Sequence, residues 1–260
     1  MTEEAIEVAG LTYRYPDGTA ALRGVNLGVS VGETVGIVGP NGAGKTTLLL
    51  HLNGSLSPTR HSRFGDGARG TGAVRILGTE VGRNNLKQIR SEVGFVFENP
   101  EHQLFMPTVF EDVAFGPLNQ GVPPEDLGPI VAQALAEVGM QGAESRSPHH
   151  LSLGQKRRVA LATVLAMQPK ILALDEPLAG LDPRGRRETM HLIAALPQTK
   201  VIASHDLEMI LELCRRVFLL DAGEIIATGP TAQLLADQSL MEAHGLEVPV
   251  SLRVSQRPCP

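Results

Sequence analysis

The sequence has little cysteine, no excess of positive charge and no long apolar run. Its two cysteines, Cys214 and Cys259, make no disulfide framework, which favours a reducing compartment. The formal net charge of −5 argues against nucleic acid as the main partner. No stretch approaches the roughly 20 apolar residues that a membrane helix needs, and Met1–Glu7 carries acids where a signal peptide has basic and apolar residues. We therefore expect other chains to supply any membrane-spanning part.

The remaining pattern is that of an α/β protein. A length of 260 residues with 42 % hydrophobic residues suits one such domain with a subsidiary subdomain. Residues 6–27 read as strands with a turn at Pro16–Gly18, and residues 100–167 are mainly helical. Further strands are predicted at Thr34–Val38, Val74–Leu77, Val93–Phe97, Ile171–Leu174, Val201–Ser204 and Val217–Leu220. This layout predicts a parallel-sheet core interrupted by a helical insertion.

Three other stretches complete the layout. Ser57–Gly72 is rich in glycine, arginine and serine, which predicts a long surface loop. We expect this locally basic loop to be inert, with contact to lipid headgroups or a partner as an alternative. Thr231–His244 is predicted to be helical, and Glu247–Pro260 is expected to be poorly ordered.

The most informative stretch fits the phosphate-loop pattern of a glycine, four residues, a glycine, a lysine and a hydroxyl residue. It consists of Gly39, Pro40, Asn41, Gly42, Ala43, Gly44, Lys45, Thr46 and Thr47. Glycines let the backbone curl until its N–H groups point at phosphate oxygens. Lys45 can reach the outer phosphates, and the Thr46 hydroxyl can ligate Mg²⁺. A strand before the loop and a helix from Lys45 to Asn53 supply the right context, so we predict that the chain binds a nucleoside triphosphate.

Two acids follow the apolar run Ile171–Leu174, at the strand edge where ligands gather in open α/β sheets. Asp175 suits a contact with Mg²⁺ through water, and Glu176 could polarise a water for in-line attack on the γ-phosphate. Ser152 stands at a predicted helix N-cap beside a small glycine, a suitable place for an anion. Taken alone, this helix start favours an ordinary capped helix.

The order of these pieces resembles the ATP-binding cassette (ABC) family of transport ATPases. The phosphate loop is followed by a Ser-x-Gly-Gln helix start, a strand ending in Asp-Glu, Gly180-Leu181-Asp182 and Ser204-His205. The resemblance runs from about Ile6 to Leu235. It implies a P-loop NTPase core with a parallel sheet, a small antiparallel β subdomain and an inserted helical subdomain at about residues 100–167. It also implies a nucleotide-binding domain over residues 1–235, a C-terminal tail over residues 236–260, and ATP and Mg²⁺ as cofactors.

Cassettes of this family work as head-to-tail pairs, so the resemblance implies a homodimer or a heterodimer with a related ATPase. Each ATP would lie between the phosphate loop of one subunit and the signature segment of the other. On the partner-facing side, the resemblance assigns ATP contacts to Ser152, Gly154, Gln155 and Asp182. The signature usually reads Leu-Ser-Gly-Gly-Gln, and Leu153 stands here for the first glycine, at a position that varies within the family.

On the phosphate-loop side, the resemblance assigns Mg²⁺ to Thr46 and Asp175, the general base to Glu176 and a γ-phosphate contact to His205. Tyr15 matches the aromatic residue that stacks on adenine, with Tyr13 as the competing candidate and a plain β-sheet tyrosine as the alternative.

Glu98 is the more serious departure from the family, which places at this position a glutamine that helps to hold Mg²⁺ and reports to the membrane partner. A carboxylate can still ligate Mg²⁺. It also brings negative charge near the γ-phosphate and the attacking water. We therefore count Glu98 among the catalytic and metal residues, and we expect it to slow hydrolysis or to raise the Mg²⁺ requirement.

A closer likeness is to ATPases of energy-coupling-factor transporters, which drive uptake of vitamins and of cobalt or nickel ions. It rests on Tyr13–Gly18, Asn99–Phe105 and Glu111–Pro117, and Pro148–Ser152 looks most like the cobalt/nickel branch. The implied partners are a membrane-embedded coupling subunit and a substrate-binding membrane subunit, with the ATPase peripheral on the cytoplasmic face of the cell membrane. Candidates for the groove that receives the coupling subunit are Gln103, Leu104 and Phe105, of which Leu104 and Phe105 could equally be core residues.

Other readings fit less well. A soluble cassette acting on nucleic acid or ribosomes usually has two cassettes or a long coiled coil, and this acidic chain has neither. A regulatory module that barely hydrolyses ATP is favoured by Glu98 but not by Glu176 and His205. His149 and His150 lack the spacing of a metal-ligand pair, and Lys156–Arg158 reads as a solvated helix face.

Overall fold

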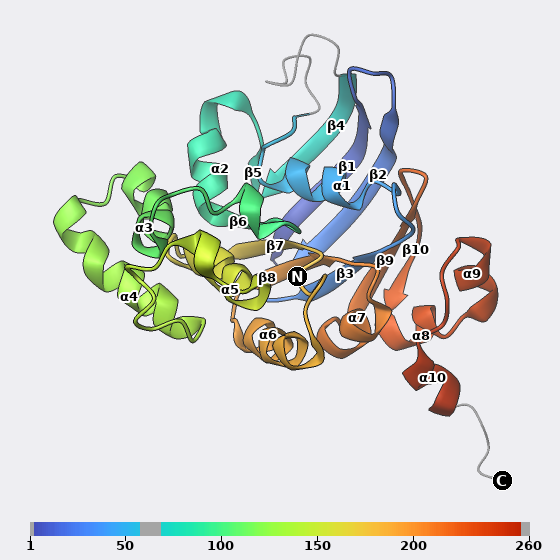
Figure 1. Cartoon of the computed structure of the whole chain (residues 1–260). Coiled ribbons are helices and arrows are strands. Elements are labelled where there is room, and N and C mark those ends of the chain that lie inside the picture. The colour runs from blue at the N-terminus through green and yellow to red at the C-terminus, as the bar shows by residue number, and fades with distance from the viewer. Residues whose placement is uncertain (1–2, 58–68, 256–260) are drawn as a thin grey trace.

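A computed structural model describes residues 3–57 and 69–255 of the chain. Two sheets lie one above the other (Figure 1). The smaller sheet is antiparallel with the order β2-β1-β4-β5. Its strands are β1 (Glu4–Arg14), β2 (Ala20–Ser30), β4 (Arg69–Ile76) and β5 (Thr79–Glu80). The end of the predicted Ser57–Gly72 loop is thus part of β4, whereas residues 58–68 lie outside the described residues.

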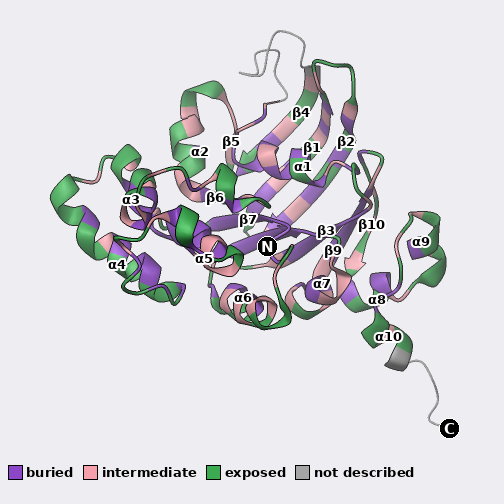
Figure 2. Cartoon of the chain, in the orientation of Figure 1, coloured by how far each residue is buried: buried purple, intermediate pink, exposed green. Residues whose placement is uncertain are grey.

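The larger sheet has the order β10-β9-β3-β8-β7-β6 and is parallel except for β10. Its strands are β3 (Thr34–Val38), β6 (Val93–Val96), β7 (Ile171–Asp175), β8 (Thr199–Ala203), β9 (Arg216–Asp221) and β10 (Glu224–Pro230). Every residue of β7 and β8 is buried, as expected for strands covered on both faces (Figure 2).

Successive side chains of a strand point to opposite faces, so the large sheet contributes to two cores. Ile171 and Ala173 pack in the core between the two sheets, which also encloses α1 (Lys45–Leu52). Leu172 and Leu174 pack on the other face, beneath the remaining helices. The phosphate loop connects β3 to α1 and therefore lies at the carboxyl edge of the large sheet.

Most other helices are placed around this sheet (Figure 1). Those between β6 and β7 are α3 (Val109–Gln120), α4 (Leu127–Glu137) and α5 (Leu153–Leu165), with short 3₁₀ turns at η2 (Pro100–His102), η3 (Pro124–Asp126) and η4 (Pro148–His150). The others are α2 (Leu86–Glu92), preceded by η1 (Arg83–Asn85), α6 (Pro183–Ala195) and α7 (Leu207–Leu213). In the part of the chain that the structure describes, no helix combines the length and apolar character required to cross a bilayer.

The C-terminal part is more ordered than its sequence suggests. The stretch predicted as one helix forms two, α8 (Thr231–Leu235) and α9 (Gln238–Ala243). The expectation of a poorly ordered end is wrong for the residues before 256, which include α10 (Val250–Ser255). The buried Val248 anchors this segment, and the Ser251 hydroxyl donates to Glu208 of α7 over 2.6 Å.

Candidate functional site

The phosphate loop has a backbone that only glycine can adopt at two points. Gly44, the N-cap of α1, has a φ of 107°, and a Cβ there would lie 2.5 Å from the carbonyl oxygen of Ala21. Gly39 has a φ of 156°, and its Cβ would lie 1.9 Å from the carbonyl oxygen of Leu220. The curl that points loop N–H groups inward therefore depends on glycine at these positions.

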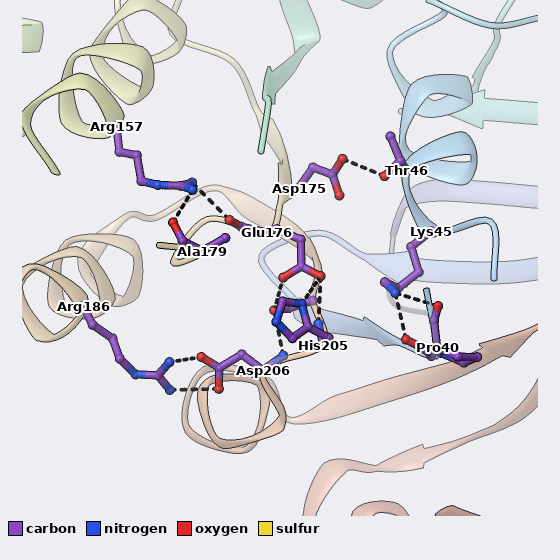
Figure 3. A network of polar contacts seen from close by, with 12 residues as sticks. Pro40, Lys45, Thr46, Arg157, Asp175, Glu176, Ala179, Arg186, His205 and Asp206 are labelled. Carbon is purple, nitrogen blue, oxygen red and sulfur yellow. Dashed lines mark hydrogen bonds and ion pairs between the residues drawn. The ribbon is translucent and has the colours of Figure 1, made fainter. Parts of the chain in front are cut away.

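Lys45 is buried, and its ammonium group donates to the loop's own carbonyl oxygens, at 2.8 Å to Gly39 and 3.0 Å to Pro40 (Figure 3). Burial lowers the pKa of Lys45, and the charges of Glu176, Asp175 and Glu98 oppose that shift. A cation held by neutral carbonyls in a partly desolvated loop is well suited to exchange these partners for a phosphate oxygen.

Thr46 and Asp175 meet although 129 positions separate them: the Thr46 hydroxyl donates to the Asp175 carboxylate over 2.8 Å. The pKa of Asp175 is raised to about 6, chiefly by burial and also by the charges of Glu176 and Glu98, while the bond from Thr46 and the charge of Lys45 oppose the shift. These donors are all oxygens, which is the chemistry that Mg²⁺ selects. Among the described residues, no three acidic, histidine or cysteine side chains form a cage for a metal. That fits Mg²⁺, which takes one or two carboxylates together with water and substrate phosphates.

The carboxylate of Glu176 is held by several hydrogen bonds. Glu176 has a left-handed φ of 45°, an unusual conformation for a residue other than glycine. Its carboxylate accepts hydrogen bonds from the Ser204 hydroxyl at 2.7 Å and from the His205 backbone N–H at 2.9 Å, and its Oε1 lies 2.8 Å from His205 Nδ1 (Figure 3). Ser204 and His205 follow β8, the strand beside β7, so the parallel pairing brings the three residues to one edge. The carboxylate therefore has a defined direction.

One cleft of about 510 Å³ gathers most of the predicted residues of the phosphate-loop side. Its lining includes Tyr15, Asn41, Gly42, Ala43, Gly44, Lys45, Thr46, Thr47, Glu98, Asp175, Glu176 and His205. The Tyr15 hydroxyl lies 2.9 Å from that of Thr47. Tyr13, the competing candidate, is only 1 % exposed and packs edge-on against Tyr15 from the core side. Of the two tyrosines, Tyr15 alone can meet a ligand in the cleft.

The signature residues lie apart from this cleft. Ser152, Gly154 and Asp182 line a second cavity, of about 350 Å³, which shares no lining residue with the first. Ser152 is the N-cap of α5 in a capping box: its hydroxyl accepts from Gln155 N at 3.3 Å, and Gln155 Oε1 accepts from Ser152 N at 3.1 Å. Asp182 caps α6 without a reciprocal bond: its carboxylate accepts from Gly185 N at 2.6 Å. Within one chain, the two groups of predicted ATP ligands do not meet.

Two buried or bridging side chains were missed by the sequence reasoning. Arg157 is buried and donates to the carbonyl oxygens of Glu176 and Ala179, so the interpretation of Lys156–Arg158 as a solvated face is wrong at this position. Its spacing to Ala160 and Val164, on the apolar face of α5, could have revealed it. Arg186 on α6 forms a bidentate ion pair with Asp206, next to His205. No local signal indicates that pair.

A further cavity, of about 700 Å³, is a groove between α2, α3 and α5. Phe105 and Phe115 form its aromatic part, with ring centroids 5.1 Å apart at 85°, and they are 59 % and 41 % exposed. Gln103 also lines the groove, whereas Leu104 is buried in the core and does not. The prediction of Leu104 as a groove wall is therefore wrong, because its side chain points to the opposite side of the segment.

Gln103 connects the groove to α5 and to the segment that follows β6. Its Nε2 donates to Ala160 O and to the Thr163 hydroxyl on α5, each over 2.7 Å. Its Oε1 accepts from Phe97 N at 3.3 Å, one residue before Glu98. A shift of the groove wall would therefore move both α5 and the segment that carries Glu98.

Comparisons with known proteins identify the family. The family model described as ABC transporter matches residues 22–179. A putative ABC transporter ATP-binding protein of Gloeobacter violaceus is 52 % identical over 251 residues, which cover 96 % of this chain and 98 % of the relative. The energy-coupling factor transporter ATP-binding protein EcfA of Methanothermobacter thermautotrophicus is 47 % identical over 247 residues, covering 94 % of this chain and 76 % of the relative.

Two solved structures share the fold. That of cbiO1 from Clostridium perfringens, described as part of the ABC transporter complex cbiONQ, has a TM-score of 0.78 and 34 % identity, covering 98 % of this chain and 100 % of that one. A dimeric ATP-binding cassette in a post-hydrolysis state with ADP and Pi has a TM-score of 0.75 and 27 % identity, covering 87 % and 98 %. The predicted fold class is confirmed.

Proposed function

This chain belongs to the ABC transporter family and is an ATPase of that family, and we propose that it powers an energy-coupling-factor importer for cobalt or nickel ions. Support for the importer comes from relatives named EcfA and from the structural likeness to cbiO1. The observation that carries the hydrolytic part is the single cleft in which the phosphate loop faces the fixed carboxylate of Glu176.

In the proposed mechanism, Tyr15 stacks on the adenine and the N–H groups of the phosphate loop hold the β- and γ-phosphates. Lys45 gives up its carbonyl partners for phosphate oxygens. Thr46 and Asp175 would hold Mg²⁺, with Glu98 beside them, and the ion would supply positive charge next to the phosphate oxygens. Glu98 is the exposed member of this acidic group.

Glu176 would orient the attacking water and accept its proton on a carboxylate oxygen. The Ser204 hydroxyl and the His205 N–H keep that carboxylate aimed into the cleft. The side chain of His205 is 63 % exposed, so its imidazole could exchange the contact with Glu176 for one with the γ-phosphate. The water would then be the nucleophile of an in-line displacement that releases ADP and inorganic phosphate.

The second cavity supports the proposal of a head-to-tail pair. Ser152, Gly154 and Gln155 form the N-terminus of α5 with an exposed hydroxyl, suited to a phosphate group, and Asp182 at the start of α6 lines the same cavity as Ser152. Within the same chain they share no cavity with the phosphate loop. A second copy of this chain, or a related ATPase, would bring its own signature residues to the ATP held here.

The aromatic groove supports docking to a membrane-embedded coupling subunit. Phe105, Phe115 and Leu118 leave an apolar surface exposed on one side of the helical region. Cytoplasmic helices of the coupling subunit would occupy this groove, and a substrate-binding membrane subunit would capture the cargo. The protein would then be peripheral, on the cytoplasmic face of the cell membrane.

Two measurements test the proposal. Purified protein should release phosphate from MgATP, and Glu176→Gln should reduce the release to a small residual rate while ATP still binds. Reconstitution with the membrane subunits should give ATP-dependent uptake of cobalt or nickel ions. Uptake of a vitamin in place of the metals would contradict the cargo and keep the importer. Retention of full hydrolysis by Glu176→Gln would contradict the role of this carboxylate.

A further inference from the structure

Arg157 is buried without an acidic partner among the described residues. It is 7 % exposed, and its Nη1 donates over 3.1 Å to the carbonyl oxygen of Glu176. Its Nη2 donates to the carbonyl oxygen of Ala179, and its Nε is buried with no hydrogen-bond partner in the described structure (Figure 3). The positively charged group thus binds only two backbone carbonyl oxygens, both in the loop after β7, among the described residues.

This arrangement is a poor source of stability. Burial lowers the pKa of Arg157, and only the more distant charges of Glu98 and Glu176 oppose the shift. Taking a charge out of water is costly, and even a buried ion pair is weak evidence for stability. Stability alone therefore does not account for an arginine at this position.

The backbone that Arg157 grips is strained. Glu176 has a φ of 45°, and a left-handed conformation is unfavourable for a residue other than glycine. Its N–H donates to Ala203 O at 2.9 Å, and its carbonyl oxygen accepts from Ala179 N at 3.1 Å as well as from Arg157. These bonds fix the peptide groups on both sides of the Cα, which sets the direction of the side chain.

Arg157 also lies in the second turn of α5, the helix that begins after Ser152. The guanidinium is therefore a direct link between the helix start predicted to face the partner's ATP and the peptide of the proposed base. If α5 moved along or across its axis, Arg157 would displace the carbonyl group of Glu176. The carboxylate of Glu176 would then move with its backbone.

We propose that Arg157 is a positioning residue, which makes the aim of the Glu176 carboxylate depend on the position of α5. The inference rests on the proposed role of Glu176 as the proton acceptor. Arg157 would touch neither ATP nor the water. It would act through the Glu176 backbone alone, so its loss would slow the chemical step and leave ATP binding intact.

The first experiment compares Arg157→Met and Arg157→Lys with the wild-type full-length protein. In Arg157→Met we expect kcat to fall roughly 10- to 100-fold, since a misplacement of about 1 Å can have that effect. The Kd for ATP and the KM should change less than about threefold, since the phosphate loop is untouched. Arg157→Lys should recover part of kcat because an ammonium group can reach one of the two carbonyls.

Arg216→Met is the matched control. Arg216 also donates to a carbonyl, that of Gly28 at 2.7 Å, and pairs with Glu33, but it lies away from the cleft. This variant should lose stability and keep kcat per folded molecule. A kcat of Arg157→Met within twofold of the wild type, or a fall shared equally by Arg216→Met, would overturn the inference.

A double-mutant cycle separates this inference from the proposed function. In a Glu176→Gln background, Arg157→Met should have no further effect on the residual hydrolysis, because the group it positions is gone. A full additional loss there would mean that Arg157 acts elsewhere and would overturn the inference. Full activity of Glu176→Gln by itself would instead remove the proposed base, whatever Arg157 does.

Discussion

The two cavities predicted to handle ATP differ in how completely one chain builds them. In the phosphate-loop cleft, Lys45, Asp175 and Glu176 are buried. Lys45 donates to carbonyl oxygens of its own loop. Asp175 and Glu176 instead accept hydrogen bonds from residues 129 and 28 positions away in the sequence. In the second cavity, Ser152 and Asp182 are exposed and bond only within their own helix caps. The side chains of the first cavity are therefore held in place by the rest of the chain. The polar groups of the second cavity remain exposed and could bind a ligand held by another subunit.

This contrast predicts that variants of the two cavities fail in different ways. Lys45→Ala should lose ATP binding in the isolated chain, because truncating one partner of a buried charged contact costs about 2–5 kcal/mol. The expected loss of affinity is on the order of 30-fold or more. Calorimetric titration with MgATP measures it, with Lys170→Ala as the surface control. Wild-type affinity in Lys45→Ala would move the nucleotide out of this cleft.

Gly154→Asp should bind ATP with wild-type affinity and hydrolyse it roughly 10- to 100-fold more slowly, because the added charge would repel the partner's γ-phosphate. Phosphate release, measured beside ATP binding, distinguishes the two effects. Mixing this variant with Lys45→Ala should restore part of the activity, since a mixed pair contains one intact combination of phosphate loop and signature. No recovery, with mixed pairs shown to form, would contradict the head-to-tail arrangement.

The same contrast holds within one short segment. Leu104 is 5 % exposed and Phe105 is 59 % exposed. Leu104→Ala should lower the free energy of unfolding by about 2–4 kcal/mol, whereas Phe105→Ala should change it by less than about 1 kcal/mol. Urea unfolding measures both. Binding to the coupling subunit should respond in the opposite order, and equal losses of stability would contradict the division into core and groove.

His51 tests the core beneath the cleft. It is fully buried in α1, with Nδ1 2.8 Å from Thr47 O, and burial lowers its pKa to about 4. The unfolded chain takes up this proton near pH 6.5, so stability should be lost as the pH falls from there through 4. The loss is on the order of 1–3 kcal/mol.

The matched variant is His51→Gln, whose side chain cannot take up a proton. Between pH 7.5 and pH 4.5, the urea midpoint of unfolding should fall further for the wild type than for this variant. Comparing the two proteins removes the shared contribution of the carboxyl groups. Parallel curves would contradict the buried, neutral state of His51.

Glu98→Gln should have the smallest effect, a few-fold rise in turnover, because Glu98 is exposed and water screens part of its charge. The gain should appear as a higher kcat or as a lower Mg²⁺ requirement. Glu80→Gln, at a similarly exposed position on β5, is the control. Unchanged turnover at both limiting and saturating Mg²⁺ would refute the idea that Glu98 slows the enzyme.

Much of the cleft could be predicted because its signals are local. The glycines of the phosphate loop, Lys45 and Thr46 act within a few residues, and a run of apolar residues before Asp175 indicates a strand end. The expected N-cap at Ser152 is also present, since a cap depends on the next three residues. The roles of these residues in catalysis stay predictions until the variants above are measured.

The amino-acid sequence by itself determined the backbone curl of the phosphate loop, the helix start at Ser152 and the succession of strands along the chain. Short-range sterics and hydrogen bonds dictate these features. Only the tertiary structure decided that Arg157 is buried against Glu176, that Leu104 turns inward and Phe105 outward, and that the two ATP-facing cavities are separate. Each of those depends on which distant element packs against the side chain. The spacing within a segment can indicate that a side chain such as Arg157 is buried, but it does not identify the distant element that the side chain contacts.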